Sequence, residues 1–200
     1  MNSSSDPLLR SRATLVLLAT LFFAPFIAAW VIYTYFPSFR PDGTTNYGTL
    51  VSPARPLPEF VLHNADGTPA SELFHEKWSL VYLGADFCDD ACEARLILIR
   101  QVRLALGKDL SRLVRVYIAP DQAALSQAEV RLGPAHPGLK LVRDDGEAGH
   151  RASEFFTGAD AHGVYLVDPN GNWLMLYTGN LEPKPLLGDL KKLLRLSSIG

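Results

Sequence analysis

The sequence predicts an α/β domain preceded by one membrane-spanning helix. Two features carry this prediction. Residues 13–36 contain no charged side chain, and from Leu57 onward short apolar runs of strand length alternate with longer segments of helical periodicity. A length of 200 residues suits one domain with an appendage. The formal net charge of −2 offers no basic face, so we expect no nucleic-acid partner.

The apolar segment at residues 13–36 has the length of a membrane anchor. A helix of this length would span about 36 Å, and a bilayer's hydrocarbon core is about 30 Å thick. Aromatic residues cluster at its C-terminal end, as in an interfacial belt: Trp30, Tyr33 and Tyr35. Two arginines precede the segment and one follows it closely, which places residues 1–12 in the cytoplasm. A cleaved signal peptide and a buried core helix are the alternatives.

Residues 37–56 are rich in proline, with glycine, serine and threonine and no hydrophobic period, and we expect a tether there. The folded domain is then residues 57–200. It opens with a predicted β-hairpin turning at Asp66 and Gly67. The remaining predicted elements are strand 78–83, helix 91–106, strand 113–119, helix 121–132, strand 139–142, helix 147–156, hairpin strands 164–167 and 173–177, and helix 185–196. This order is that of a thioredoxin-like α/β domain with an N-terminal β-hairpin extension.

Cys88 and Cys92 are the two cysteines of the chain, and they lie between a predicted strand and a predicted helix. One cysteine pair is too little for a disulfide scaffold, so the pair serves a redox or soft-metal site, or is incidental. Residues four apart on a helix place their Cβ atoms about 5–6 Å apart, which suits chelation. A disulfide needs about 3.5–4.5 Å, so it closes only if Cys88 lies in the turn before the helix, as Gly84 upstream allows.

Four carboxylates surround the pair: Asp86, Asp89, Asp90 and Glu93. A helix N-terminus lowers the pKa of a thiol, whereas neighbouring carboxylates oppose the thiolate. The acidic surroundings therefore favour a bound cation or a basic partner over a fast thiol nucleophile. Helix capping is the alternative role for these carboxylates.

The segment YLGADFCDDAC resembles the FGYTxCPDxCP signature of the Sco/SenC family, membrane-anchored copper-handling factors of cytochrome c oxidase assembly. The stretches PLPEFVLHNADG, VRVYIAPD and VYLVDPNGNWLMLY are similar to other parts of that family, so the resemblance runs from Leu57 to Leu196. Asp89 and Glu93 replace the two prolines of the signature. The family's third copper ligand, a histidine, aligns with Asp160, and His162 follows two residues later on the same side of an extended chain.

The resemblance implies that Cys88, Cys92 and His162 bind copper, and two thiolates with one imidazole suit Cu(I). It implies a metallochaperone more than an enzyme. The protein would deliver copper to the CuA site of cytochrome c oxidase subunit II, or reduce the cysteines of that site, and other assembly factors are further expected partners. It would be a single-pass protein of the inner (cytoplasmic) membrane with its domain in the periplasm.

Two alternatives remain open. The first is a periplasmic thiol–disulfide oxidoreductase of thioredoxin or peroxiredoxin type, in which Cys88 and Cys92 cycle without metal. The second is a non-metal assembly scaffold with a degenerate site.

Overall fold

The computed structural model describes residues 7–36, 46–70, 72–158, 162–197 and 199. The chain divides into two compact units, Met1–Thr45 and Asn46–Gly200, and each is described by itself. The first contains the helix α1, Pro7–Tyr35, with Pro25 in its interior. Within it, Arg12–Tyr35 is long and apolar enough to cross a membrane, and none of this segment is buried. The expected apolar helix is therefore present, and it indicates a single-pass membrane anchor.

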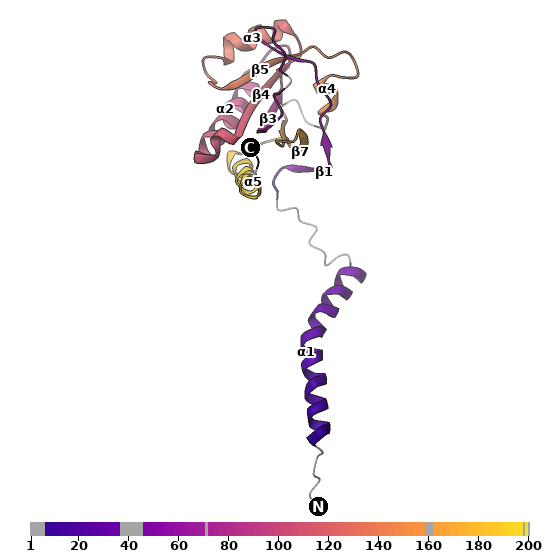
Figure 1. The fold of residues 1–200 in the computed structure, drawn as a ribbon. Coiled ribbons are helices and arrows are strands. Elements are labelled where there is room, and N and C mark those ends of the chain that lie inside the picture. Colours follow the sequence, from indigo (N-terminus) through magenta and orange to yellow (C-terminus); the bar gives the residue numbers. More distant parts are fainter. Residues whose placement is uncertain (1–6, 37–45, 71, 159–161, 198, 200) are drawn as a thin grey trace, which may run out of the picture. The chain divides into compact units, whose positions relative to one another are not determined.

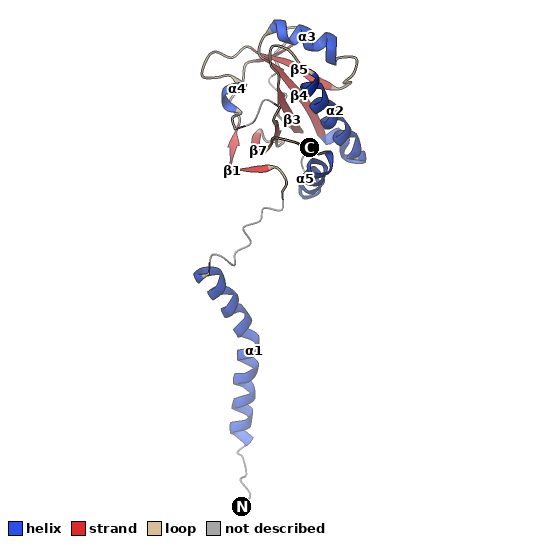
Figure 2. Cartoon of the chain, turned by 180° about the vertical axis from the view of Figure 1, so that it is seen from behind, coloured by secondary structure: helices blue, strands red, loops and turns tan. Residues whose placement is uncertain are grey.

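The second unit is built on a seven-stranded sheet with the order β1-β7-β6-β3-β4-β5-β2 (Figures 1 and 2). The strands are β1 Thr49–Pro56, β2 Leu62–Asn64, β3 Trp78–Leu83, β4 Leu113–Ala119, β5 Leu139–Asp144, β6 Val164–Val167 and β7 Asn172–Tyr177. The helices are α2 Asp90–Ala105, η2 Gly107–Arg112, α3 Gln122–Leu132, α4 Ala152–Phe155 and α5 Pro183–Leu196. Strands β3, β4 and β5 run parallel, β6 pairs antiparallel with β3, and β7 pairs antiparallel with β6. The thioredoxin-like fold predicted from the element order is confirmed.

Continuous apolar runs form the centre of the sheet because both faces of β3 and β4 are covered. Leu80 and Tyr82 face the cluster formed with α2, α3 and α5. Val81 lies in the opposite cluster, with Phe156 and Trp173. Figure 1 shows α2 and α5 on one side of the sheet and α4 on the other. The chain therefore passes from the end of β3 to the start of α2 next to the apolar cluster that β3 forms with α2, α3 and α5.

Strand β1 lies in residues 49–56, which the sequence pattern assigned to the tether. It pairs antiparallel with β7, from Thr49 opposite Leu176 to Pro56 opposite Asn172. Nearly all of its residues are exposed, and it contains two prolines. An edge strand held by backbone pairing needs no apolar alternation and tolerates proline, so its sequence resembled a linker.

The predicted hairpin extension is present, with a short second arm. The turn forms as expected, with Gly67 at φ 82° and the Asn64 amide donating to the Thr68 carbonyl. The returning arm forms one bridge, between His63 and Pro69, whereas β2 pairs with β5. The extension thus becomes the outer edge of the main sheet.

A buried carboxylate ties the start of this unit to its last helix. Asp189 of α5 is 2 % exposed and accepts hydrogen bonds from the Tyr47 and Gly48 amides, at 3.0 and 2.9 Å, and from the Tyr177 hydroxyl at 3.2 Å. Burial, followed by the charge of Asp189, raises the pKa of Tyr177 well above its usual range. Three donors thus hydrogen-bond to this carboxylate, as a buried charge requires.

Candidate functional site

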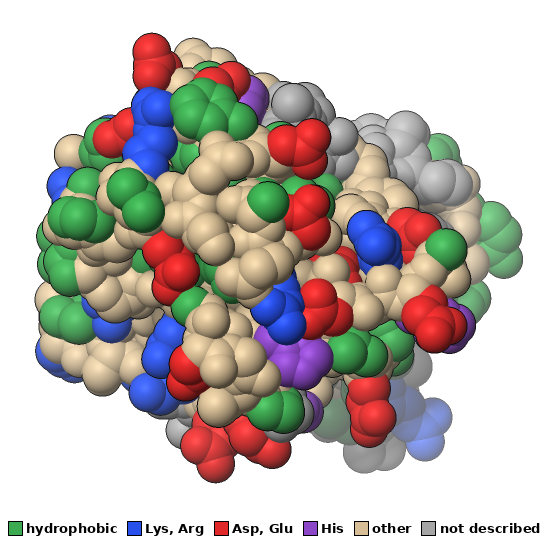
Figure 3. All heavy atoms as spheres, turned by 90° about the horizontal axis from the view of Figure 1, so that it is seen from above, with side chains coloured by type: hydrophobic (Ala, Val, Ile, Leu, Met, Phe, Trp, Pro, Cys, Tyr) green, Lys and Arg blue, Asp and Glu red, His purple; other side chains and the backbone are tan. Residues whose placement is uncertain are grey.

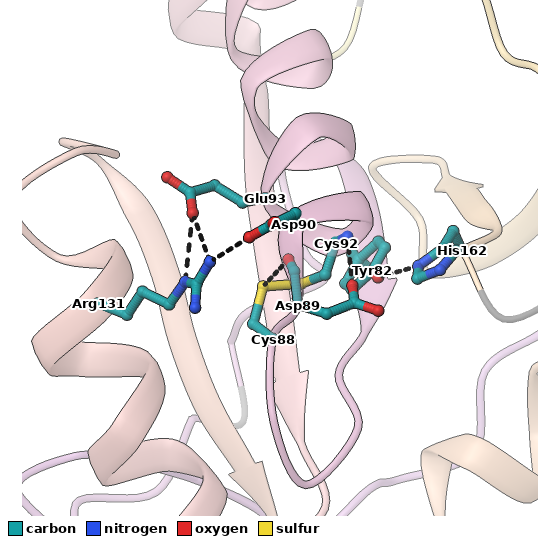
Figure 4. Close-up of a disulfide and its surroundings, with 8 residues drawn as sticks. All are labelled: Tyr82, Cys88, Asp89, Asp90, Cys92, Glu93, Arg131 and His162. Atoms are coloured by element: carbon teal, nitrogen blue, oxygen red, sulfur yellow. Dashed lines mark hydrogen bonds and ion pairs between the residues drawn. A yellow bond between two sulfur atoms is a disulfide. The ribbon is translucent and has the colours of Figure 1, made fainter.

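Cys88 and Cys92 form a disulfide where β3 passes into α2, with a Cα–Cα distance of 5.3 Å (Figure 4). Helix α2 begins at Asp90, so Cys88 lies in the preceding turn, as closure of the bond requires. Gly84 is necessary to this path. A Cβ at Gly84 would lie 2.3 Å from the Tyr117 ring, and the Gly84 amide donates to the Ile118 carbonyl at 2.8 Å. At Gly84, where the chain leaves the sheet, the backbone is therefore in close contact with β4.

Asp89 is the N-cap of α2. Its Oδ1 accepts a hydrogen bond from the Cys92 amide at 2.8 Å, and its backbone carbonyl accepts from the Glu93 amide. The capping role considered for the carboxylates is thus confirmed for Asp89. Because this cap binds the amide of a site cysteine, it also fixes the first turn of α2 against the disulfide.

The disulfide is almost completely covered. Cys88 is 4 % exposed and Cys92 is 3 % exposed, and both belong to the apolar cluster that includes Tyr82 and Tyr117. By contrast Phe87, directly before Cys88, is 55 % exposed. A reacting thiolate can therefore reach the sulfur atoms through a small opening or by displacing the turn that carries Phe87 and Cys88.

Arg131 of α3 contacts the same turn from the neighbouring helix, as Figure 4 shows. Its guanidinium lies 3.0 Å from an Asp90 oxygen and 3.0 Å from a Glu93 oxygen. It also lies over the Phe87 ring, 5.1 Å from the centroid. Hydrogen bonding to Glu93 is the main cause that raises the pKa of Arg131. Sequence reasoning missed Arg131, because no local pattern places residue 131 beside residue 90.

His162, expected as a third metal ligand, contacts Tyr82. Its Nδ1 lies 2.8 Å from the Tyr82 hydroxyl, and the two rings are stacked. Tyr82 in turn stacks on Tyr117, whose pKa burial raises to about 12. The structure thus places His162 against a residue of the apolar cluster that holds both cysteines.

A preformed metal site is not found among the described residues, where no three His, Cys, Asp or Glu side chains are grouped for one. Asp160, the other position considered for a ligand, lies outside the described residues. The face of the molecule that Figure 3 shows carries acidic and basic side chains intermixed. In this form of the protein Cys88 and Cys92 are joined to each other as a disulfide.

Comparisons with known proteins agree with this architecture. A family model described as transmembrane-like, thioredoxin-like, C-terminal domain matches residues 78–197. A search of curated protein sequences finds no match.

Solved structures share the fold at low identity. Apo Sco1 from Thermus thermophilus matches with a TM-score of 0.59 and 20 % identity, covering 74 % of this chain and 97 % of that one. Copper-bound ScoI from Arabidopsis thaliana matches with a TM-score of 0.55 and 20 % identity, covering 75 % and 99 %. A thio-disulfide isomerase from Thermus thermophilus matches with a TM-score of 0.52 and 18 % identity, covering 75 % and 99 %. The resemblance to Sco proteins is thus confirmed at the level of the fold.

Proposed function

Because the chain belongs to the family of transmembrane-like, thioredoxin-like C-terminal domains, we propose that Cys88 and Cys92 exchange electrons with thiols or disulfides of a partner protein. One observation carries the proposal: the two cysteines are already paired at the junction of β3 and α2, with Cys88 before the helix and Cys92 in its first turn. The N-terminus of α2 favours negative charge, and so it stabilises a thiolate formed there.

The exchange moves two electrons in two steps. A partner thiolate attacks one sulfur of the Cys88–Cys92 bond, which breaks, and the electron pair leaves on the other sulfur as a thiolate that can take up a proton. A mixed disulfide results. A second partner thiolate then attacks the partner's own sulfur in that bond, which leaves the partner oxidised and both protein cysteines reduced. Run in reverse, the same steps reduce a partner disulfide.

Copper handling by the reduced pair is the second candidate. It is supported by the ligand set, since two thiolates and the imidazole of His162 suit Cu(I), and by the fold shared with copper-bound ScoI. Thiolates bind metal, so the disulfide must be reduced first. His162 must also exchange its contact with Tyr82 for the metal. The ion would be cargo, passed to the CuA site of cytochrome c oxidase subunit II or to another assembly factor.

The location we propose follows from the anchor. With residues 1–12 in the cytoplasm and residues 13–36 crossing the inner membrane, the second unit would lie in the periplasm. Thiols tend to be oxidised in that compartment, so a reducing partner would be needed to open the Cys88–Cys92 bond.

Redox titration of the full chain in neutral detergent tests the exchange. The protein is equilibrated in thiol–disulfide buffers, free thiols are alkylated, and the mass shift is measured. We expect a reversible two-electron transition that disappears in both Cys88→Ser and Cys92→Ser. A bond that stays closed in every buffer that leaves the protein folded would contradict the proposal.

A Cu(I) competition titration separates the second candidate. Reduced protein is titrated without oxygen against a chromogenic chelator. Binding of one equivalent, lost in Cys88→Ser and weakened at least tenfold in His162→Ala, supports copper handling. Reversible exchange without copper binding leaves the oxidoreductase. Failure of both tests leaves the scaffold alternative.

A further inference from the structure

The attacking group in thiol–disulfide exchange is an anion, and the turn around Cys88 is acidic. Four carboxylates lie in this turn and the first turn of α2: Asp86, Asp89, Asp90 and Glu93. Like charges repel an approaching thiolate, so this arrangement by itself slows the proposed reaction. The opposing cation comes from another helix, because Arg131 of α3 contacts two of the four.

The geometry of Arg131 suits charge compensation. Its Nη2 lies 3.0 Å from both Asp90 Oδ1 and Glu93 Oε2, and its Nε lies 3.2 Å from Glu93 Oε2. The Asp90 side chain is fully exposed, and the side chains of Arg131 and Glu93 are about one-third exposed. Ion pairs this exposed contribute little to folding stability. Their charges nevertheless act on an ion that approaches from solvent, within the screening length of the salt present.

Arg131 also contacts the residue next to the site cysteine. Its guanidinium lies 5.1 Å from the centre of the Phe87 ring, within the range of a cation–π contact. Phe87 directly precedes Cys88, so this contact connects α3 to the turn that covers the disulfide. One side chain thus contacts both two carboxylates of the first turn of α2 and the aromatic ring of the turn before it.

We propose that Arg131 is a positioning residue of the site: it contacts Phe87 in the turn before Cys88, and it neutralises Asp90 and Glu93 so that an anionic thiolate can approach the disulfide. The inference rests on the proposed exchange function. It names a determinant of the partner, since the charge around the partner's thiol becomes part of recognition. Loss of Arg131 should penalise anionic thiols more than those carrying an ammonium group.

The test compares two small reductants on the full chain in neutral detergent. Cysteamine carries an ammonium group, and 2-mercaptoethanesulfonate carries a sulfonate. Second-order rate constants for opening the disulfide are measured at low salt and corrected for the thiolate fraction of each reagent. In Arg131→Met we expect the rate ratio of cysteamine to sulfonate to rise about threefold, the size of one uncompensated charge at about 8 Å in screened water. The difference should shrink at high salt.

Matched variants separate charge from packing. Arg131→Lys keeps the charge and should hold the ratio near that of the wild type. Lys108→Met removes one exposed positive charge just beyond the far end of α2, and the 16-residue length of that helix makes it a distant control. Its ratio should not change. Asp90→Asn with Glu93→Gln, in a chain that keeps Arg131, should lower the ratio, and this variant tests the idea even if Arg131→Met does not fold.

The outcomes are distinguishable. An unchanged ratio in Arg131→Met, with the wild-type disulfide opening normally, overturns the role of Arg131 and leaves the exchange function standing. Equal behaviour of the Lys and Met variants overturns the charge argument as well. If neither reductant opens the wild-type disulfide, the proposed function fails and this inference fails with it.

Discussion

Two aspartates bind backbone amides at different places in the folded unit, in different surroundings. Asp189 is buried and accepts hydrogen bonds from Tyr47, Gly48 and Tyr177. Asp89 is exposed and accepts from the Cys92 amide at the start of α2. Removing a buried acceptor leaves its donors without hydrogen-bond partners, whereas donors that lose an exposed acceptor form hydrogen bonds with water. Stability should therefore depend on Asp189, and the behaviour of the site should depend on Asp89 and the charges near it.

The largest expected effect is at Asp189. In Asp189→Ala three donors lose their acceptor, and we expect the free energy of unfolding to fall by about 3 kcal/mol. Asp189→Asn keeps the shape and one acceptor oxygen, so its loss should be smaller. Chemical unfolding of the detergent-solubilised protein, followed by tryptophan fluorescence, measures both. If Asp189→Ala left the free energy of unfolding unchanged but slowed disulfide exchange, Asp189 would act on the site and not on stability, which would contradict the comparison.

Tyr117 belongs to the buried cluster that holds the two cysteines, and its contribution to stability can be tested by varying the pH. Burial raises its pKa from about 10 to about 12, so the folded state keeps a proton that the unfolded state releases. Its contribution to stability is complete below pH 10 and is lost as the pH rises to 12, by about 2–3 kcal/mol in total. Between pH 9 and pH 12 the free energy of unfolding should fall more steeply for the wild type than for Tyr117→Phe. Parallel curves would show that Tyr117 does not resist ionisation.

Gly84 tests whether the site depends on packing as well as on charge. In Gly84→Ala the new Cβ would meet the Tyr117 ring at 2.3 Å, and overpacking of this kind costs about 1–3 kcal/mol. The end of β3 should shift, and the disulfide should become easier to reduce. Unfolding and redox titration measure the two effects. Combining it with Tyr117→Leu, which makes room, should cost less than the sum of the single changes, and an additive result would place the strain elsewhere.

Much of the fold could be predicted because buried strands and amphipathic helices carry their burial in the sequence. The continuous apolar run WSLVYL has the length of a buried strand and was predicted as one, and Cys88 and Cys92 lie where that strand leads into a helix. Strand β1 could not be predicted, since an exposed edge strand is held by backbone hydrogen bonds that side chains do not encode.

The site was predicted in its local part only. The cysteines and the capping aspartate lie within five residues of one another, so spacing and capping rules apply to them. The ion pairs of Arg131 span 38 and 41 residues and depend on how α3 packs beside α2. The contact of His162 with Tyr82 likewise depends on the pairing of β3 with β6.

The smallest expected effect is at Asp89, and it separates capping from charge. Asp89→Ala removes the cap and a negative charge, so we expect a loss of about 1 kcal/mol in the free energy of unfolding. Asp89→Asn removes the charge but keeps an acceptor for the Cys92 amide, and its stability should stay near that of the wild type. Both variants take a carboxylate from the turn, so both should react faster with an anionic reductant. If only Asp89→Ala reacted faster, fraying of the first turn of α2 would control access to the disulfide, and the repulsion by carboxylates would be secondary.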